Sequence, residues 1–160
     1  MKHFSPDNFH NCHLGLLLGR AALLKDRILD THMEPHGITA AQFKVLIIIA
    51  LYGVDSPGEL CRYLSLDSGS MTRMLDRLEQ KGFLARQRSE ADRRQVQLVL
   101  TEEGQKLADR LPHIGADAMN ELAGAVTPEE LKTLEHILKK ILLAAGDAIT
   151  VLRLGSDNEQ

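Results

Sequence analysis

The sequence has no tryptophan, and aromatic residues make up only 4% of its 160 positions. A folded core must therefore rest mainly on leucine, isoleucine and alanine. The only two cysteines, Cys12 and Cys61, form no CxxC pair, which excludes a disulfide framework. No repeat or low-complexity linker divides the chain, so we expect residues 1–160, of which 44% are hydrophobic, to form a single domain.

Long apolar runs are also missing. The longest run, 45–52, falls far short of the roughly 20 residues that a membrane span needs. The N-terminal residues carry no secretory signal, so we expect a cytoplasmic protein with no membrane partner. The sequence also lacks the P-loop, GxGxxG, GxSxG and HExxH motifs. We therefore expect neither an enzyme nor a bound cofactor.

The stretch from Leu60 to Gly104 has the clearest pattern in the chain. Asp67 is a favourable residue for a helix N-cap, and Gly82 suits a helix end. Between these two residues, an apolar stripe recurs at helical spacing. The stripe consists of Met71, Met74, Leu75 and Leu78. With the short segment 60–64 before it, this pattern predicts a helix, a turn and a second helix.

Two segments of period-two alternation follow the predicted helix pair. They occupy residues 83–88 and 95–100, and the polar run 89–94 separates them. Such a pattern is typical of two strands joined in a hairpin, here with a charged tip. A helix-turn-helix followed by a basic hairpin is a winged helix, which fits double-stranded DNA.

The charge of residues 69–94 differs from that of the rest of the chain. This window holds seven basic and four acidic residues, a balance of +3, whereas the whole chain carries −3 and the remainder therefore −6. Six of the seven basic residues are arginine, which forms forked hydrogen bonds to phosphate and guanine better than lysine does. An acidic protein with one basic window is expected to bind an anionic partner through that window.

The stretch 66–104 resembles the MarR family of bacterial transcription regulators. Its most specific parts are Asp92-Arg93-Arg94 and the segment 100–104, Leu-Thr-Glu-Glu-Gly. The resemblance extends over about residues 12–146. It implies a mainly α fold with a small β-hairpin, in which a winged helix-turn-helix core is flanked by long terminal dimerisation helices. It also implies a homodimer that regulates transcription, which we expect to be a repressor.

The boundaries expected within this single domain follow from the helix patterns. The DNA-binding lobe should span 39–100, and dimerisation helices should span 8–34 and 102–152. Seams at coiled-coil spacing run along 14–28 and 131–152, which favours packing against a second copy.

Several local signals mark the ends of the expected helices. Capping sequences begin at Thr39, Ser56 and Thr127. Pro112 should interrupt the helix that starts after Thr101.

The DNA contacts follow from the predicted recognition helix and wing. In a dimer, two recognition helices would enter successive major grooves about 34 Å apart, so the operator should be pseudo-palindromic. Side chains on the polar face would read base edges and nearby phosphates, while backbone amides at the helix start would bind phosphate. The resemblance implies that a wing arginine enters the minor groove, and Asp92 would hold a neighbouring arginine in place. The expected DNA-binding residues are Ser68, Gly69, Ser70, Thr72, Arg73, Arg77, Asp92, Arg93 and Arg94.

Three kinds of control remain open from the sequence. Arg20 lies in the apolar stretch 16–24 and is similar in position to an arginine that binds aromatic carboxylates in some relatives, so an organic acid is the favoured effector. Cys12 lies near the start of the first helix, where hydroperoxide-sensing relatives keep a reactive cysteine, and the segment 66–72 resembles that branch. The hypothesis of redox control is weakened because Ala40, Ala41 and Phe43 occupy the positions at which those relatives have tyrosines. A metal-responsive regulator would use the group His10, Cys12 and His13, although its spacing matches no standard zinc motif.

Overall fold

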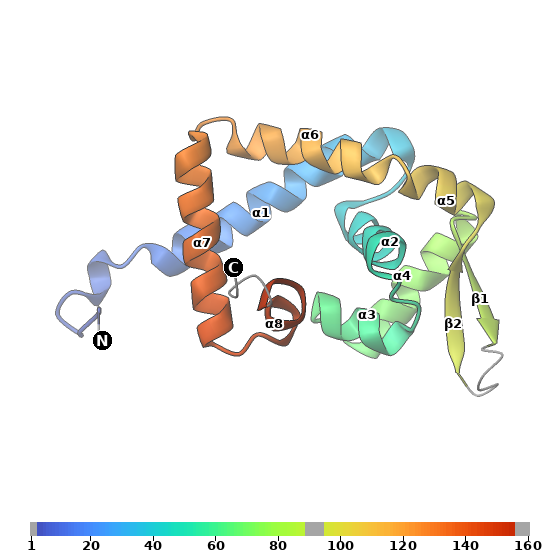
Figure 1. Ribbon diagram of the computed structural model, residues 1–160, viewed down its shortest axis with the longest axis horizontal. Coiled ribbons are helices and arrows are strands. Elements are labelled where there is room, and N and C mark those ends of the chain that lie inside the picture. The colour runs from blue at the N-terminus through green and yellow to red at the C-terminus, as the bar shows by residue number, and fades with distance from the viewer. Residues whose placement is uncertain (1–2, 89–94, 156–160) are drawn as a thin grey trace.

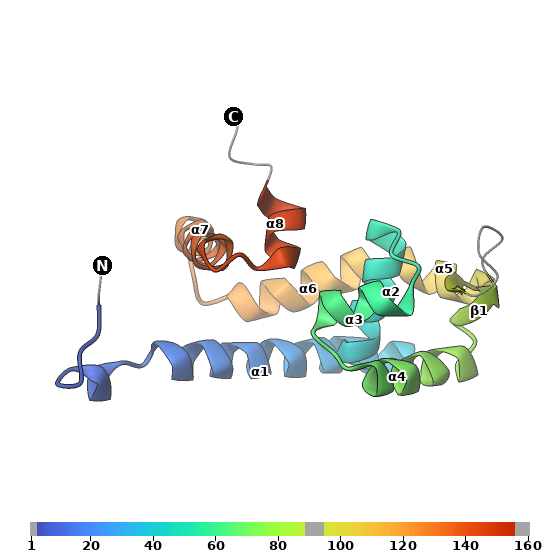
Figure 2. The ribbon, with the colours of Figure 1, turned by 90° about the horizontal axis from the view of Figure 1, so that it is seen from below.

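The computed structural model describes residues 3–88 and 95–155. In chain order the elements are η1 (Phe9–Asn11), α1 (Leu14–Met33), η2 (Glu34–His36), α2 (Ala40–Tyr52), α3 (Pro57–Leu64), α4 (Ser68–Gln80), β1 (Leu84–Arg88), β2 (Val96–Leu100), α5 (Glu102–Ala108), α6 (Leu111–Ala123), α7 (Pro128–Ala144) and α8 (Ala148–Leu154). The helices α1 and α6 lie side by side (Figures 1 and 2). The hairpin occupies one end of the molecule, and α7 lies toward the opposite end (Figure 1). This mainly helical fold with a small hairpin confirms the predicted fold class.

Side-chain caps explain where most helices begin. Thr39 and Thr127 each form a complete capping box, as predicted, with the residue three positions later. Ser56 caps α3 by accepting from the amide of Glu59 at 3.2 Å. However, the Glu59 carboxylate accepts from the Ser56 hydroxyl at 3.3 Å, so the predicted reciprocal box is only half formed. At the other end of α2, Gly53 has a φ of 64°, which suits glycine and ends the helix.

The predicted apolar stripe of α4 forms one wall of the core. Met71, Leu75 and Leu78 are fully buried, and Met74 packs against the same cluster. They meet buried side chains from α3 and both strands, among them Leu60, Leu84 and Leu98. Because the apolar stripe packs into the core, the polar side of α4 faces away from the core. The stripe prediction is therefore confirmed.

The two strands pair antiparallel, with Leu84 opposite Leu100 and Arg88 opposite Val96. The segment before α3 holds the free side of β2, because the carbonyl of Asp55 accepts the amide of Leu98 at 2.7 Å. The Asp55 carboxylate also accepts from the side chain of Gln97 at 2.7 Å. These bonds fix the wing relative to α3, so the wing and the helix-turn-helix form one unit.

Each of the last two predicted helices forms two shorter helices in the structure, α5 and α6 in the first case and α7 and α8 in the second. Pro112 interrupts the first as expected: α5 ends at Ala108, and the proline lies in the first turn of α6, where its missing N–H costs little. The expectation of one continuous seam over 131–152 is wrong. Gly146 adopts a φ of 69° and Asp147 caps a new helix, so α7 and α8 run in different directions (Figure 1).

The first helix also begins later than predicted. We expected a helix over 8–34, whereas Phe9–Asn11 forms a short 3-10 turn and α1 begins at Leu14. His13, at the position before the helix, makes no side-chain cap. The side chain of Asn8, a residue type that often caps helices, instead accepts from the Ser5 amide at 2.7 Å and so does not cap a helix here.

Gly104 provides a sharp test of how the hairpin joins α5. A Cβ atom at this position would lie 1.9 Å from the carbonyl oxygen of Phe83, a backbone atom that cannot move alone. We expect Gly104→Ala to destabilise the fold by about 1–3 kcal/mol or more, as overpacking does. The control is Gly58→Ala on the exposed side of α3, where a Cβ meets nothing within 4 Å. Urea denaturation should show the control to be neutral or more stable, and equal stabilities of both variants would contradict the close contact.

The N-terminal part of α1 is apolar and exposed. Its leucines include Leu16 and Leu17, which are 64% and 62% exposed. Within 3–88 and 95–155, no single helix is long and apolar enough to cross a membrane. The segments 9–36 and 40–52 satisfy that test only when joined across a bend of 79°, by length and composition alone. The second of these segments contains α2, most of which is buried in the core.

Candidate nucleic-acid interface

The start of α4 is organised by Asp67. Its carboxylate accepts from the Ser70 amide at 2.9 Å and from the Ser70 hydroxyl at 2.7 Å. These hydrogen bonds hold the pKa of Asp67 below its usual value. Because the folded pKa is depressed, the stabilising charge is present above the ordinary carboxyl pKa and is lost only as the pH falls through the folded value. At neutral pH the cap is therefore charged, and the first turn of the helix is held in place.

The residues that begin α4 are Ser68 and Gly69, both predicted to offer amides to a phosphate. The amide of Ser68 is among the helix-start donors that have no partner inside the helix. At Gly69, an added Cβ would lie 3.2 Å from Asp67 Oδ1 and 3.6 Å from a guanidinium nitrogen of Arg73. Glycine thus leaves room for the capping carboxylate of Asp67, whereas the contact with Arg73 would be an ordinary van der Waals one.

The polar face of α4 presents the predicted recognition side chains. Thr72, Arg73 and Arg77 are exposed, whereas Ser70 is half-buried. Arg73 donates to the Ser70 hydroxyl at 3.1 Å, so a chain of bonds runs from the Asp67 carboxylate through Ser70 to the guanidinium. The hydroxyl of Thr72 donates to the Ser68 carbonyl at 2.8 Å, which leaves its methyl group exposed. This face therefore combines a preoriented guanidinium with small polar and apolar groups, as base-edge recognition requires.

Arg86 has a role that sequence reasoning missed. It lies on β1, and its guanidinium contacts the carboxylates of Asp76 and Glu79 on α4 at 2.7 Å each. Its backbone amide also donates to Glu79 at 3.2 Å. The positive charge of Arg86 is therefore neutralised by two carboxylates, and its side chain joins the wing to the recognition helix. The alternating pattern placed Arg86 correctly on a strand, but only the packed structure reveals these partners.

Lys81 holds the other end of the recognition helix. Its ammonium group donates to the Gly37 carbonyl at 2.5 Å and to the side chain of buried Gln42 at 2.9 Å. Gln42 also belongs to the capping box of α2. The position of α4 is thus fixed from both sides, by Lys81 at its end and by Arg86 from the wing.

These contacts predict different effects for Arg86 on β1 and for Arg77 on the polar face of α4. Arg86→Met should lower operator affinity by loosening the wing, without changing the salt dependence, because Asp76 and Glu79 already occupy the guanidinium. Arg77→Ala should reduce the slope of log K against log salt by about 0.9, the value for one phosphate contact. Fluorescence anisotropy titrations at several salt concentrations measure both. An equal reduction in slope for the two variants would contradict the positioning role of Arg86.

The predicted wing-tip residues Asp92, Arg93 and Arg94 lie outside the described residues. The strands that lead to them carry exposed side chains at Arg88 and Val96. The hairpin stands at the same end of the molecule as the C-terminal end of α4 (Figure 2). The arrangement of helix and hairpin is thus that of a winged helix, and the roles of the wing-tip residues remain predictions.

The structure places the predicted control residues away from this face. Arg20 is exposed on α1 and, among the residues described, has no hydrogen-bond or ion-pair partner. The acid considered for it, Glu121, instead contacts His32 at 2.8 Å. Cys12 is half-buried and precedes α1 by two residues.

The metal-binding alternative finds no support in the geometry. In the part of the chain that the structure describes, no group of three or more His, Cys, Asp or Glu side chains is placed to hold a metal ion. The three residues considered for it, His10, Cys12 and His13, are all within that part. We therefore do not propose metal control.

Comparison with known proteins agrees with this geometry. A model described as the MarR family matches residues 38–96. The multiple antibiotic resistance protein MarR of Salmonella typhimurium is 42% identical over 130 residues, which cover 81% of this chain and 90% of that protein. A solved structure of a cysteine-to-serine variant of MarR from Escherichia coli, complexed with operator DNA, matches with a TM-score of 0.76 and 39% identity, over 87% of this chain and 99% of that one.

A more distant structure comes from Mycobacterium tuberculosis. It is a MarR family protein in complex with p-aminosalicylic acid, with a TM-score of 0.65 and 26% identity, over 80% of this chain and 97% of that one.

The fold, the face of α4 and the similarity to regulators lead to one conclusion. The helix-turn-helix and the hairpin form a winged helix, and the relatives are transcription regulators rather than enzymes. The chain belongs to the MarR family and is a transcriptional regulator that binds operator DNA.

Proposed function

We propose that the protein works as a homodimer that represses transcription from a pseudo-palindromic operator and is released by a small organic acid. The observation that carries the dimer is the exposed apolar surface of the terminal helices. In the single chain α7 buries no residue, although one side of it is apolar. Exposed apolar side chains of α1 and α7 include Leu14, Leu17, Leu24, Leu134, Ile137 and Ile141. Apolar surface of this extent on a soluble regulator favours a partner of the same kind.

A two-fold axis through the terminal helices would present two copies of α4 to one face of the DNA. Recognition helices of such dimers enter half-sites about 34 Å, or one helical turn, apart. A dimer bound at a promoter would cover duplex that RNA polymerase also needs. Repression follows if the operator overlaps a promoter, and this activity belongs in the cytoplasm, where the DNA is.

Arg20 supports an acidic effector. It lies among exposed leucines of α1, between Leu17 and Leu23. Once a second copy covers this surface, a guanidinium without a partner would be costly to bury. A carboxylate would provide that partner, and the similar structure from Mycobacterium tuberculosis is in complex with an aromatic acid. Binding would release DNA to the extent that the ligand prefers the state that does not bind the operator.

The alternative is oxidation at Cys12. The thiol lies just before α1, close to the proposed dimer surface, so a change in its charge or bulk would disturb the same helices. The two modes of control make opposite predictions for single substitutions.

We expect Arg20→Ala to abolish release from DNA by phenolic acids while leaving operator affinity intact, and Cys12→Ser to change neither. Gel-shift titrations with and without phenolic acids or an organic hydroperoxide measure this. Arg27→Ala, which changes another exposed arginine of α1, is the control. If hydroperoxide releases wild type and Arg20→Ala but not Cys12→Ser, control is by oxidation and the acid proposal is wrong.

A further inference from the structure

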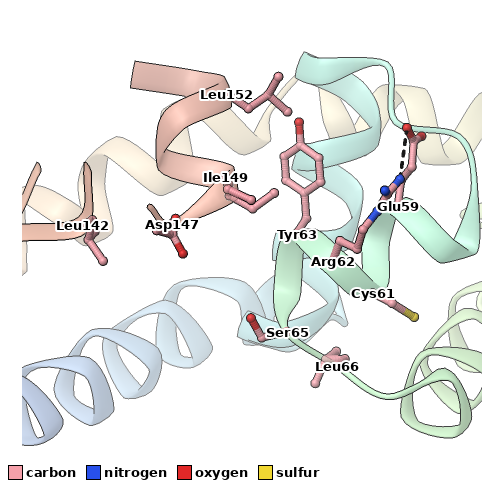
Figure 3. A pocket seen from close by; sticks show the side chains of 11 residues that line it. Glu59, Cys61, Arg62, Tyr63, Ser65, Leu66, Leu142, Asp147, Ile149 and Leu152 are labelled. Atoms are coloured by element: carbon pink, nitrogen blue, oxygen red, sulfur yellow. Dashed lines mark ion pairs between the residues drawn. The ribbon is translucent and has the colours of Figure 1, made fainter. Parts of the chain in front are cut away.

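A crevice of about 820 Å³ lies between α3 and the α7–α8 turn. Its apolar surface comes from both sides, with Leu66 after α3 and Leu142, Ile149 and Leu152 from the arm. The ring of Tyr63 projects from α3 toward Ile149 and Leu152 (Figure 3). The crevice is thus large enough for an organic ligand and offers it both aliphatic and aromatic contacts.

The charged groups around this crevice are mainly acidic. Glu59 and Asp147 contribute carboxylates, and the one cation among the lining residues, Arg62, contacts Glu59 at 3.8 Å (Figure 3). Asp147 accepts from the Thr150 amide at 2.8 Å, and hydrogen bonds from Thr150 lower the pKa of this carboxyl. Asp147 is therefore charged at neutral pH, and the lining residues carry one net negative charge, which a further arginine at the edge of the crevice, Arg153, balances while it lies against Tyr63.

An aromatic pair at the edge of the crevice already holds a cation. The rings of Tyr52 and Tyr63 stack with centroids 6.2 Å apart and planes 25° apart. The guanidinium carbon of Arg153 lies 3.7 Å from the centroid of Tyr52 and 5.0 Å from that of Tyr63. Arg153 also donates to the Tyr63 hydroxyl. Its Nε is buried and has no hydrogen-bond partner among the described residues. The guanidinium therefore lacks one hydrogen bond in this position.

We propose that this crevice binds an organic cation with apolar substituents, which competes with Arg153 for the face of Tyr63. The carboxylates attract the positive charge, the aliphatic side chains cover the substituents, and the aromatic ring favours a weakly hydrated cation. Once Arg153 is displaced, the lining keeps one net negative charge, which favours a cation over an anion. Displacing Arg153 would detach α8 from α2 and α3, so a bound cation would change how the arm is joined to the DNA-binding lobe. Only this consequence at DNA rests on the proposed function, because binding itself needs no operator.

Two ions of the same shape and opposite charge test this site. Tetraphenylphosphonium and tetraphenylborate should be titrated separately into the full-length protein without DNA, and binding followed by isothermal titration calorimetry. We expect the phosphonium to bind once per chain and the borate at least about tenfold more weakly. Equal binding of both ions would mean apolar adsorption only and would overturn the proposal. Binding of neither ion would also overturn it, for instance because a second copy fills the crevice.

Substitutions then locate the bound cation. Tyr63→Leu should weaken phosphonium binding about five- to thirtyfold, the range expected for a partly desolvated cation–π contact. Tyr63→Phe keeps the ring but loses the hydroxyl that Arg153 contacts, so its binding should equal or exceed that of wild type. Arg153→Met removes the competing guanidinium and should strengthen binding. Wild-type affinity for Tyr63→Leu, or weaker binding by Arg153→Met, would contradict the proposed competition.

A final variant covers the case in which Tyr63→Leu does not fold. Asp147→Asn removes the charge but keeps a side chain that caps α8 nearly as well. We expect it to weaken phosphonium binding about two- to fivefold, as for a solvent-exposed charge pair, and to leave borate binding unchanged or stronger. Thermal melting confirms that each variant is folded. An unchanged phosphonium affinity in a folded Asp147→Asn would show that the carboxylate does not attract the ligand. Operator binding with and without the phosphonium, measured separately, tests the consequence at DNA.

Discussion

Arg73→Ala should lose roughly 5- to 150-fold in affinity for the operator and much less for an unrelated duplex. Arg73 is exposed on α4, and the chain of bonds from Asp67 through Ser70 already orients it. A forked contact to guanine is worth about 1–3 kcal/mol of discrimination, which corresponds to that loss. Fluorescence anisotropy with operator and scrambled duplexes of equal length measures both affinities.

The matched variant for this prediction is Arg73→Lys. It keeps the positive charge but loses the planar fork, so the salt dependence of binding should stay as in wild type while specificity falls. If Arg73→Lys discriminates as well as wild type, Arg73 contacts a phosphate and not a base. If Arg73→Ala binds the operator as wild type does, α4 is not the recognition helix.

Paired substitutions on α7 should have the other large effect. Ile137 and Ile141 are 48% and 47% exposed in the single chain, so Ile137→Asp with Ile141→Asp leaves the fold of the chain intact. In a dimer, the same carboxylates would be buried without partners, at a cost of several kcal/mol. We expect sedimentation to show a monomer at concentrations where wild type is a dimer, and operator binding to be lost.

Lys132→Asp is the control for this pair. It lies on the same helix and is exposed, but it is about 140° around the helix from Ile137. It should therefore remain a dimer. A fully dimeric Ile137→Asp, Ile141→Asp double variant would mean that this side of α7 is not part of the interface.

Features that depend on neighbouring residues were predictable from the sequence. The stripe from Met71 to Leu78, the cap at Asp67 and the two strands each follow from a local rule of spacing or hydrogen bonding. The capping boxes at Thr39 and Thr127 were found for the same reason. These elements position the recognition face, so the candidate site was largely visible before the structure.

Features that depend on packing over long distances were not predictable. The contact between Arg153 and Tyr63 joins residues 90 positions apart, and no local pattern indicates it. The two acids that neutralise Arg86 were visible as residues but not as its partners. Both cases are contacts between elements whose relative placement the pattern of one element does not determine.

Two further differences have a physical reason in the sequence itself. Gly146 followed by Asp147 is a helix stop and a new cap, a signal that the regular spacing of the leucines around it concealed. Arg20 lies in the apolar stretch 16–24, yet the leucines around it are exposed in the single chain. The proposed dimer would account for the apolar character of that stretch, and burial of Arg20 would then cost free energy only once the second copy is bound.

The most direct test of the account is selection of binding sites by the full-length protein from a library of random duplexes, at fixed salt. A dimer with two α4 helices should enrich inverted repeats whose half-site centres lie about 10 base pairs apart, one helical turn. The monomeric α7 double variant should enrich no such repeat under the same conditions. Enrichment of single half-sites by wild type, or of no sequence at all, would contradict the claim that a symmetric pair of recognition helices reads the operator.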